Sequence, residues 1–452
     1  MGTPEESDQA RKRDALDAGQ YSETTSPQCR VGGLSLPSPL QWGMSNRQDR
    51  GWAMRIELSI VMPCLNEAET IAPCIRQAHQ GAKAAGAESY EIIVADNGSS
   101  DGSQEIAQAE GASVIHVPTR GYGAALSAGI EAARGEYVVM GDSDASYDFS
   151  RLQPFLDKLR GGHQLVMGTR LRGEIEPGAM PMLHRYLGNP TLTFVGNLLF
   201  RAGLSDYHCG LRGFERRAIQ ALGLRTEGME FASEMVIRAR LAGLRICEVP
   251  ITYHPAGRTR RPHLRTWQDG WRHLRFMLLY SPRWVFLYPG TALTIIGLFG
   301  SSILLVGPVR VGSLVLDIHT LMITATMLIV GVQLVLLAVF ARAYASRAGL
   351  LPRSKRVETL LDRFSLELGL LAGLVVGFLG LALYAEGLVI WSRNAFGPLI
   401  HYQKTLRIVI AGTSFLILGT EIFFGSFITS LLSLPPANSA SADRGPERGG
   451  GN

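Results

Sequence analysis

Residues 136–146 read EYVVMGDSDAS and join a short apolar segment to two acidic side chains. Residues 136–140 predict a buried β-strand, because a continuous apolar run such as their YVVM is typical of a strand that is covered on both faces. Asp142 and Asp144 follow directly, at the carboxyl end where ligands bind in open α/β sheets. Two carboxylates this close repel each other unless a cation lies between them. The stretch therefore indicates either a solvated acidic turn or a site where Mg²⁺ or Mn²⁺ bridges a diphosphate.

Similar apolar segments alternate with helical segments on both sides of this stretch. Further strands are expected at residues 57–62, 90–95, 112–117, 164–167 and 246–253. Helices are expected near residues 68–86, 101–110, 122–134 and 150–160. Continuous apolar strands separated by helices indicate a mostly parallel sheet with helices on both faces. The expected fold class for this part of the chain is therefore α/β.

Polar residues also follow three other strands of this sheet. The segments are Pro63-Cys64-Leu65-Asn66-Glu67, Asp96-Asn97-Gly98-Ser99-Ser100-Asp101-Gly102 and Arg120-Gly121-Tyr122-Gly123. Each could be a plain turn or helix start, because Asn and Asp cap helices and Gly and Ser favour turns. Asp96 is harder to explain as turn chemistry, because it is the last residue of its strand. Taken together with the acidic pair, these strand ends favour a ligand site over a set of unrelated turns.

The order P-x-x-N-E, D-N-G-S-S-D, R-G-x-G-A and D-x-D resembles family 2 glycosyltransferases of GT-A fold, which is Rossmann-like and binds nucleotide sugars. More narrowly, the chain is similar to the branch of dolichyl-phosphate mannose synthases and bacterial polyprenyl-phosphate glucosyltransferases. The resemblance covers about residues 56–283. It implies that a nucleotide is held by Pro63, Leu65, Asn66, Glu67, Asp96, Asn97, Gly121, Asp142 and Ser143.

The resemblance also implies residues for the metal, the acceptor and catalysis. The metal ligands would be Asp142 and Asp144, with Ser146 at a position where mannose synthases often have Gln. The catalytic residues would be Asp144 together with Asp206 and Arg212 of the acceptor-side loop 206–214. The lipid phosphate or the diphosphate would be bound by Arg170, Arg185, Asn189, Arg258 and Arg260. Planar guanidinium groups suit phosphate oxygens, although the arginines could also be surface or topology signals.

The charged residues are distributed unevenly along the chain. They make up 18% of the sequence, against about 25% in an average soluble protein. Residues 284–306 and 318–341 contain no Asp, Glu, Lys or Arg, and residues 368–392 and 408–432 contain one Glu each, Glu386 and Glu421 respectively. Each run is 23 to 25 residues long, enough to cross ~30 Å of hydrocarbon. The sequence therefore predicts an integral membrane protein with four spans.

The basic residues near the spans predict the orientation. Residues 258–283 contain seven Arg, and the segment between the second and third spans is also basic. Since cytoplasmic flanks carry the excess of Lys and Arg, we expect the catalytic domain on the cytoplasmic side of the plasma membrane. No apolar signal segment precedes the first strand, and the five cysteines lack C-x-x-C spacing, which fits a reducing compartment.

The expected organisation has five parts. They are a disordered tail (1–53), a GT-A domain (54–257), a basic amphipathic segment at the membrane surface (258–283), the four-span region (284–432) and a second disordered tail (433–452). In the amphipathic segment, Leu264, Trp267 and Trp271 share one helical face, with arginines opposite. That pattern is typical of a helix that lies in the headgroup plane.

The expected function is metal-dependent, inverting transfer of glucose or mannose from a UDP- or GDP-sugar to a dolichyl or undecaprenyl phosphate. The expected partners are the nucleotide sugar, the lipid phosphate and the membrane; no nucleic acid is expected, and the spans could pair into a homo-oligomer. A processive polysaccharide synthase is one alternative, although Tyr280-Ser281-Pro282-Arg283-Trp284 only approaches the Q/R-x-x-R-W motif of those enzymes. The other is a non-catalytic lipid-handling scaffold, in which Glu386 and Glu421 would be functional.

Overall fold

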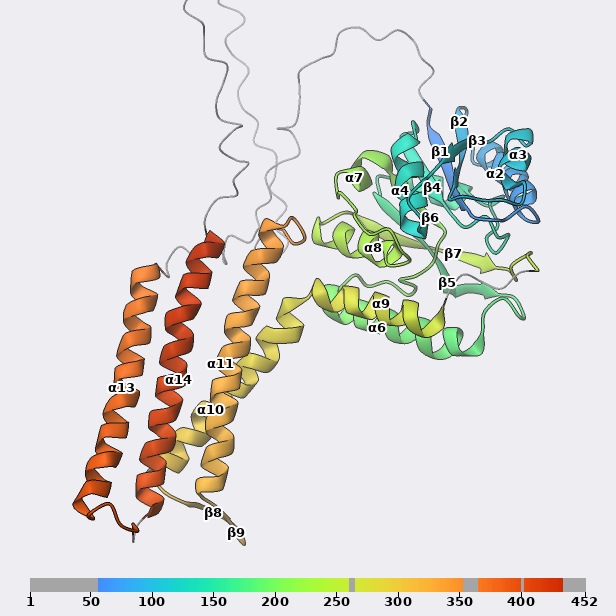
Figure 1. Cartoon of the computed structure of the whole chain (residues 1–452). Coiled ribbons are helices and arrows are strands. Elements are labelled where there is room, and N and C mark those ends of the chain that lie inside the picture. Colours follow the sequence, from blue (N-terminus) through green and yellow to red (C-terminus); the bar gives the residue numbers. More distant parts are fainter. Residues whose placement is uncertain (1–55, 260–264, 353–364, 400–401, 434–452) are drawn as a thin grey trace, which may run out of the picture. The chain divides into compact units, whose positions relative to one another are not determined.

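The computed structural model describes residues 56–259, 265–352, 365–399 and 402–433. The N-terminal tail predicted at 1–53, almost all of the C-terminal tail, and Arg260 lie outside these described residues. Within them, the chain forms an α/β domain followed by a series of long apolar helices (Figure 1). The predicted fold class is confirmed.

A seven-stranded sheet forms the centre of the α/β domain, with strand order β3-β2-β1-β4-β6-β5-β7. The strands are β1 (Leu58–Cys64), β2 (Tyr90–Asp96), β3 (Ser113–His116), β4 (Tyr137–Met140), β5 (Leu165–Ile175), β6 (Arg212–Glu215) and β7 (Ile246–Tyr253). All pairings are parallel except those of β6, which runs antiparallel to β4 and β5. The carboxyl ends of β1, β2 and β4 therefore lie at one edge of the sheet.

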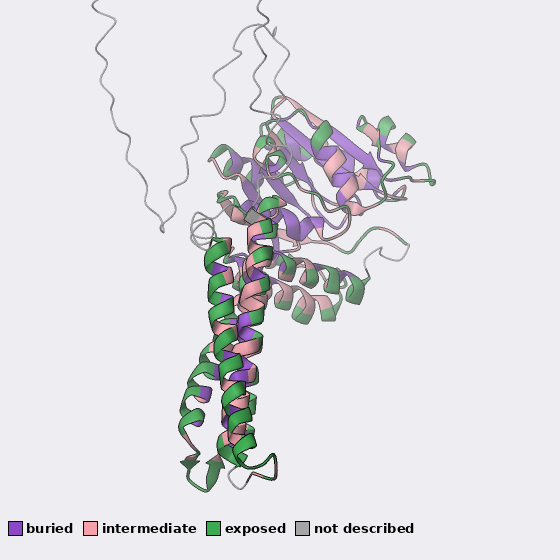
Figure 2. Cartoon of the chain, turned by 60° about the vertical axis from the view of Figure 1, so that its left-hand side comes forward, coloured by how far each residue is buried: buried purple, intermediate pink, exposed green. Residues whose placement is uncertain are grey.

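Helices pack on both faces of this sheet. On one face, α2 (Ile71–Ala84) and α5 (Gln153–Arg160) share a buried cluster with Leu58, Ile60 and Met62 of β1. On the other face, α4 (Tyr122–Ala132) and α8 (Phe231–Leu241) pack with Val61 of the same strand. Alternate residues of β1 thus enter opposite cores, which explains its continuous apolar sequence. Figure 2 shows the sheet strands as buried along most of their length.

Several parts of this domain, α8 among them, differ from the sequence-based expectation. Strand β6 was not predicted, and β5 continues to Ile175 although a strand was expected only over 164–167. The extension pairs with β7 beyond a register shift between Thr169 and Glu174. The π-helical turn η2 (His184–Gly188) and α6 (Asn189–Phe200) form one continuous helical segment, which is not among the helices expected from the sequence. The remaining helices of the domain are α3 (Ser103–Ala109) and α7 (Arg216–Gln220).

The C-terminal part is helical. It comprises α9 (Thr266–Leu279), η3 (Arg283–Leu287), α10 (Tyr288–Val306), α11 (Ile318–Arg347), α13 (Leu366–Arg393) and α14 (Tyr402–Ser433), with a hairpin of β8 (Val309–Val311) and β9 (Leu314–Leu316) between α10 and α11. Four segments are long and apolar enough to cross a membrane: 283–306, 318–347, 366–393 and 402–432. The prediction of a membrane protein is confirmed. Figure 2 shows long exposed faces on these helices, which are apolar, as lipid contact requires.

Glycines bring the membrane helices close together in pairs. A Cβ placed on Gly419 of α14 would lie 2.4 Å from the backbone nitrogen of Gly377 in α13. A Cβ on Gly297 of α10 would lie 2.3 Å from the backbone nitrogen of Leu328 in α11. Small residues at such contacts let helix backbones approach closely, which is the usual packing mode in lipid.

Candidate functional site

The loop after β4 presents the two aspartates of the D-x-D motif. Tyr122 Oη donates a hydrogen bond to Asp142 Oδ1 at 2.8 Å. Asp144 is buried and accepts from the backbone nitrogen and the hydroxyl of Ser146, at 3.0 and 2.5 Å. Ala145 lies between them with a left-handed φ of 62°, so the turn that brings the two carboxylates together is tight. Ser146 thus holds Asp144 in place through its own hydroxyl.

Burial, followed by the nearby charge of Asp144, raises the pKa of Asp142 to about 6. Burial and a neighbouring like charge both disfavour the ionised form of a carboxyl group, and a nearby positive charge favours it. Arg258, in the segment between β7 and α9, supplies such a charge: Nη2 lies 3.0 Å from Asp144 Oδ2 and Nη1 lies 2.7 Å from Glu67 Oε1. Arg258 therefore connects three parts of the chain: the loop after β1, the D-x-D loop after β4, and its own segment between β7 and α9.

The donor set fits a hard divalent cation. The described residues contain no group of three or more His, Cys, Asp and Glu side chains that could hold a metal by themselves. Mg²⁺ is usually bound by one or two carboxylates together with substrate phosphates and water, so a two-carboxylate site is sufficient for it. Asp142 and Asp144 provide such oxygens, and the contact of Arg258 with Asp144 shows that positive charge is accommodated there.

The loop after β1 is braced by the loop after β2. Asn66 adopts a left-handed φ of 57°, and its Oδ1 accepts from the backbone nitrogen of Ser100 at 2.8 Å. The hydroxyl of Ser143 donates to the carbonyl of Pro63 at 2.7 Å, which ties the D-x-D loop to the same place. A cavity of about 320 Å³ opens here, lined by Asn66, Glu67, Glu69, Ser100, Asp101 and Arg258. Leu65, between Pro63 and Asn66, is partly exposed in this loop.

Asp96 and Asn97 are engaged in building their loop. The buried carboxylate of Asp96 accepts from the backbone nitrogens of Gly98 and Ser99 and from Gln104 Nε2 at 2.7 Å. Asn97 Oδ1 accepts from the backbone nitrogen of Gly121 at 2.7 Å. Hydrogen bonds thus connect the loop of Asp96 and Asn97 to Gly121. The carboxylate of Asp96 already accepts hydrogen bonds from its own loop and from Gln104.

Gly121 occupies a position that admits no side chain. Its φ is +148°, and a Cβ would lie 2.1 Å from the carbonyl oxygen of Glu227. The R-G-x-G segment is therefore packed directly on the 225–228 loop. Its glycine is required for this approach of two backbones, whatever else it contacts.

Arg170 and Asp206, which were predicted to act on the acceptor side, form a buried bidentate pair. Arg170 Nε and Nη2 lie 2.7 and 2.9 Å from the two oxygens of Asp206. Burial alone would raise the pKa of Asp206, but Arg170 outweighs it and lowers that pKa. The Arg170 guanidinium also lies 5.3 Å from the ring centroid of Tyr253 in β7. Within the described hydrogen bonds, Nη1 of Arg170 is not used, so it can still donate to a phosphate oxygen.

Arg212 lies elsewhere than its predicted catalytic role requires. Its side chain is fully buried and donates to the carbonyls of Cys209, Ala232 and Tyr207, at 2.8, 2.7 and 3.2 Å. Burial lowers its pKa. Since three of its donors are bound to backbone, the structure gives Arg212 the task of holding the 206–214 loop rather than of contacting a substrate.

Among the described residues, no hydrogen bond or ion pair joins Arg185 or Asn189 to Arg170. Arg185, in η2, lies 5.5 Å from the ring centroid of Tyr186. Asn189, at the start of α6, donates from Nδ2 to Met180 Sδ at 3.5 Å. Both residues belong to the η2–α6 helical segment, so their predicted role at a lipid phosphate depends on what that segment contacts.

Some residues of the site were not anticipated from the sequence. Tyr122, the variable position of R-G-x-G, bonds Asp142, and Thr70 Oγ1 donates to the carbonyl of Ser143 at 2.7 Å. Ser233 Oγ links His208 Nε2, at 3.2 Å, to His273 Nδ1 of α9, at 2.8 Å. Burial lowers the pKa of His273 to about 4. Tyr122 and His208 carried a signal, because each lies inside a stretch that the sequence singled out, R-G-x-G and the loop 206–214 respectively.

The η2–α6 segment and α9 share an exposed apolar surface. In α6, Phe194 is 66% exposed, while Gly196 and Phe200 are buried. In α9 the polar residues Asp269 and His273 are buried, whereas Trp267 and Trp271 are 78% and 59% exposed. This distribution is the inverse of a helix on a soluble protein. The exposed apolar residues of these elements are Tyr186, Leu187, Phe194, Leu198, Trp267, Trp271 and Leu279, and Met182 and Leu183, which directly precede η2, are exposed as well.

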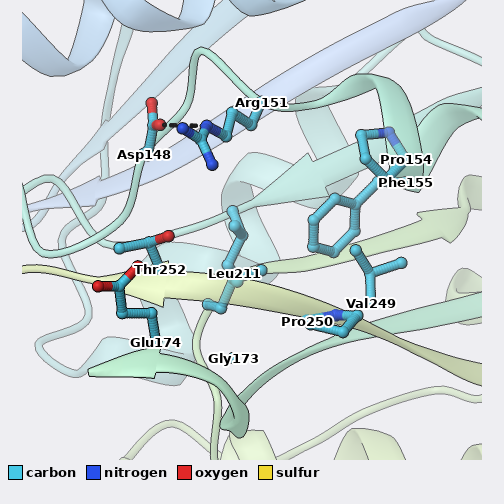
Figure 3. A pocket seen from close by; sticks show the side chains of 11 residues that line it. Asp148, Arg151, Pro154, Phe155, Gly173, Glu174, Leu211, Val249, Pro250 and Thr252 are labelled. Atoms are coloured by element: carbon cyan, nitrogen blue, oxygen red, sulfur yellow. Dashed lines mark ion pairs between the residues drawn. The ribbon is translucent and has the colours of Figure 1, made fainter.

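A second cavity, of about 250 Å³, lies between α5, β5 and β7 (Figure 3). Its walls include apolar residues such as Phe155, Leu211 and Val249, and the ion pair of Asp148 and Arg151, 3.3 Å apart. None of the residues predicted to bind nucleotide, metal or lipid phosphate lines it. The cavity is therefore separate from the candidate site.

Comparisons with known proteins identify relatives of both parts of the chain. Residues 59–223 match the family model described as glycosyl transferase family 2, and residues 339–433 match the glycosyltransferase family 2 C-terminal transmembrane region. The chain is 40% identical over 380 residues to the low-salt glycan biosynthesis hexosyltransferase Agl6 of Haloferax volcanii, covering 83% of this chain and 89% of that protein. A dolichyl-phosphate hexose transferase of the same organism is 32% identical over 205 residues, covering 45% of this chain and 86% of that protein. Glucosyl-3-phosphoglycerate synthase from Mycobacterium tuberculosis has a solved structure that is similar with a TM-score of 0.40 and 24% identity, over 51% of this chain and 81% of that chain.

Proposed function

This chain belongs to glycosyltransferase family 2 and is a glycosyltransferase, and from that premise we propose that it transfers one hexose from a nucleoside diphosphate sugar to a polyprenyl phosphate. The proposed donor is a UDP- or GDP-linked glucose or mannose, and the proposed acceptor is a dolichyl or undecaprenyl phosphate. The relative that is named a dolichyl-phosphate hexose transferase supports this choice of acceptor and sugar class.

One observation carries the proposal: Arg258 of the segment that leads into the membrane helices contacts Asp144 of the D-x-D loop and Glu67 of the β1 loop. The acidic pair and the cavity beside Glu67 suit a metal-bound diphosphate. A chain that passes from this site directly into α9 and four apolar helices brings the reaction close to a lipid surface. An acceptor that is itself a membrane lipid is the substrate class that best uses this arrangement.

The chemistry needs no separate general base. The second pKa of a phosphate monoester is about 6, so a lipid monophosphate is largely dianionic at pH 7 and is already a nucleophile. Arg170, held by Asp206, would orient the acceptor phosphate through its remaining donors. Direct attack on the anomeric carbon, opposite the leaving diphosphate, would invert its configuration.

The leaving group is stabilised by positive charge. A divalent cation held by Asp142 and Asp144 would neutralise charge that develops on the nucleoside diphosphate. Arg258 lies beside the same carboxylates and would share that task. Asn66 and Glu67 line the adjoining cavity and would position the nucleotide. Asp96, Asn97 and Gly121 would act beside them, because Asn66 is bonded to Ser100 of the loop after β2 and Asn97 to Gly121.

The basic segment around α9 and the exposed apolar surface of the η2–α6 segment and α9 support a catalytic domain that lies on the cytoplasmic leaflet. Arg185 and Asn189, in the η2–α6 segment, would then lie at the depth of lipid headgroups. Glycine-based helix contacts, as between α13 and α14, are also compatible with a homo-oligomer.

The test is a transfer assay with purified full-length protein, polyprenyl phosphate and a panel of labelled nucleotide sugars. We expect metal-dependent transfer of one sugar type, and a loss of at least about 100-fold for Asp144→Asn, because one preorganised charge interaction at the transition state is worth about that much. Asp148→Asn, which removes a carboxylate four positions further on and outside the candidate site, should keep near-wild-type activity. If Asp144→Asn kept the activity of the wild type, the proposed role of Asp144 in metal-dependent transfer would be wrong.

A further inference from the structure

Arg258 makes an ion pair with two carboxylates from different loops. Its Nη1 lies 2.7 Å from Glu67 Oε1 and its Nη2 lies 3.0 Å from Asp144 Oδ2. The Arg258 side chain is 14% exposed, and those of Glu67 and Asp144 are 7% and 10% exposed. Because solvent screens such a contact little, it is stronger than a surface ion pair.

The segment that carries Arg258 is fixed on both sides of it. The backbone nitrogens of Gly257 and His254 donate to the carbonyls of Asp144 and Ser146, at 2.9 and 3.0 Å. Thr259 donates to Glu69 from its backbone nitrogen at 2.8 Å and from its hydroxyl at 2.7 Å. These bonds fix the backbone on both sides of Arg258 and so keep its guanidinium close to the D-x-D loop.

The segment also packs closely at Gly257. A Cβ there would lie 3.2 Å from Thr70 Cγ2 and 3.4 Å from the Cβ of Ala145. The tight fit leaves Arg258 as the group that faces the acidic residues, with one donor to spare: within the described residues, its buried Nε has no hydrogen-bond partner. A buried donor without a partner costs free energy unless a ligand supplies an acceptor.

We infer that Arg258 stands in for the divalent metal in the free enzyme, competes with it for Asp144, and moves to the diphosphate when the nucleotide binds. A metal ion on Asp144 would require an oxygen contact of about 2.1 Å, and the guanidinium now lies on that carboxylate. Two cations at such close range repel each other strongly in a weakly screened site. The metal therefore displaces Arg258 from Asp144.

The diphosphate gives the displaced arginine a new partner. Its oxygens accept hydrogen bonds from a guanidinium in bidentate geometry, and Nε is available for one of them. The nucleotide thus lowers the cost of metal binding, and the metal lowers the cost of nucleotide binding, because coupling between two ligands is reciprocal. This step rests on the proposed function only for the identity of the diphosphate ligand.

The experiment measures Mn²⁺ binding to the free, full-length protein in detergent, with the signal of unbound Mn²⁺ in electron paramagnetic resonance as the readout. Arg258→Gln should bind Mn²⁺ about tenfold more tightly than wild type, which corresponds to ~1.4 kcal/mol. The same variant should bind UDP or GDP more weakly. Arg265→Gln is the matched control, because it removes the same charge from a side chain that donates to Gln268. This variant should bind Mn²⁺ and nucleotide as wild type does.

Arg258→Lys provides the second variant, because it keeps the charge but cannot bridge Glu67 and Asp144 with two nitrogens. Its affinity for Mn²⁺ should lie between those of wild type and Arg258→Gln. Equal or weaker Mn²⁺ binding by Arg258→Gln, with Arg258→Lys unchanged, would overturn the inference. Arg258→Gln could bind Mn²⁺ more tightly while the wild-type protein transfers no hexose to lipid. That result would contradict the proposed function but support the competition between Arg258 and Mn²⁺ for Asp144.

Discussion

Arg212 illustrates how one residue of a sequence motif can serve the fold. Its guanidinium donates to three backbone carbonyls in or near the 206–214 loop, which also contains Asp206. Lysine cannot reproduce this fork, so Arg212→Lys should leave at least one buried carbonyl without a donor, at a cost of about 1–3 kcal/mol. We expect a lower melting temperature, with the KM for the nucleotide sugar unchanged in the protein that remains folded.

Thermal unfolding and steady-state kinetics on the same preparation check this expectation. Arg217→Lys, a change at an exposed arginine five positions further on, is the matched control and should alter neither quantity. If Arg212→Lys kept the wild-type melting temperature but had a much lower kcat, Arg212 would act in catalysis, and the structural role proposed for it would be wrong.

At the scale of single residues, the sequence indicated the acidic pair well and its surroundings poorly. Asp142 and Asp144 are conspicuous because few structural reasons place two carboxylates behind a buried strand. The bond from Tyr122 to Asp142 joins positions 20 residues apart, and that from Arg258 to Glu67 joins positions 191 apart. No local pattern reports such pairs. For the same reason, Arg212 could not be told from an arginine that faces a substrate.

At the scale of elements, the η2–α6 segment and α9 carry the least expected feature. A membrane-surface helix was predicted for the α9 region, but not for the η2–α6 segment, where Phe194 and Leu198 are exposed. His184 Nε2 and Thr266 Oγ1, 2.9 Å apart, link this segment to α9 (Figure 1). A joint apolar surface of this kind suits the interfacial region of a leaflet.

This surface predicts a selective defect. Phe194→Asp combined with Leu198→Asp should lower transfer to long-chain polyprenyl phosphate in vesicles about tenfold or more, because burial of one such side chain is worth about 1.5–3 kcal/mol. Transfer to a short, water-soluble isoprenyl phosphate should change little. The control, Gln108→Asp with Ala109→Asp, adds the same charges on α3, whose two positions are also exposed. An equal loss with both acceptors would argue against membrane contact.

Strand β6 was missed because it lacks the apolar sequence of the strands that were predicted. The parallel strands β1, β2 and β4 were predicted because burial on both faces leaves a continuous apolar run. Strand β6 has only four residues, RGFE, with Gly and two charged side chains. It is a strand because β4 and β5 lie on either side of it, and such tertiary context outweighs local propensity.

At the scale of the whole molecule, the modest charge content of 18% is an average over two unlike parts. The α/β domain carries most of the charged residues, whereas the runs 284–306, 318–341, 368–392 and 408–432 contain only Glu386 and Glu421, and this contrast alone predicts the membrane region. Length and charge suffice for such a prediction because a span must be long and apolar. The glycine contacts that pair α10 with α11 and α13 with α14 have no comparable signature in the sequence, since they depend on which helices are neighbours.

The most direct test of the central claim is the mass of the lipid product. Full-length protein should be incubated with polyprenyl phosphate and the active nucleotide sugar, and the lipid fraction should be analysed by mass spectrometry before and after mild acid. We expect a mass increase of one hexosyl unit on the lipid phosphate, and we expect mild acid to return the original lipid and free sugar. A growing sugar polymer, or a lipid whose mass does not change while the nucleotide sugar is consumed, would contradict it.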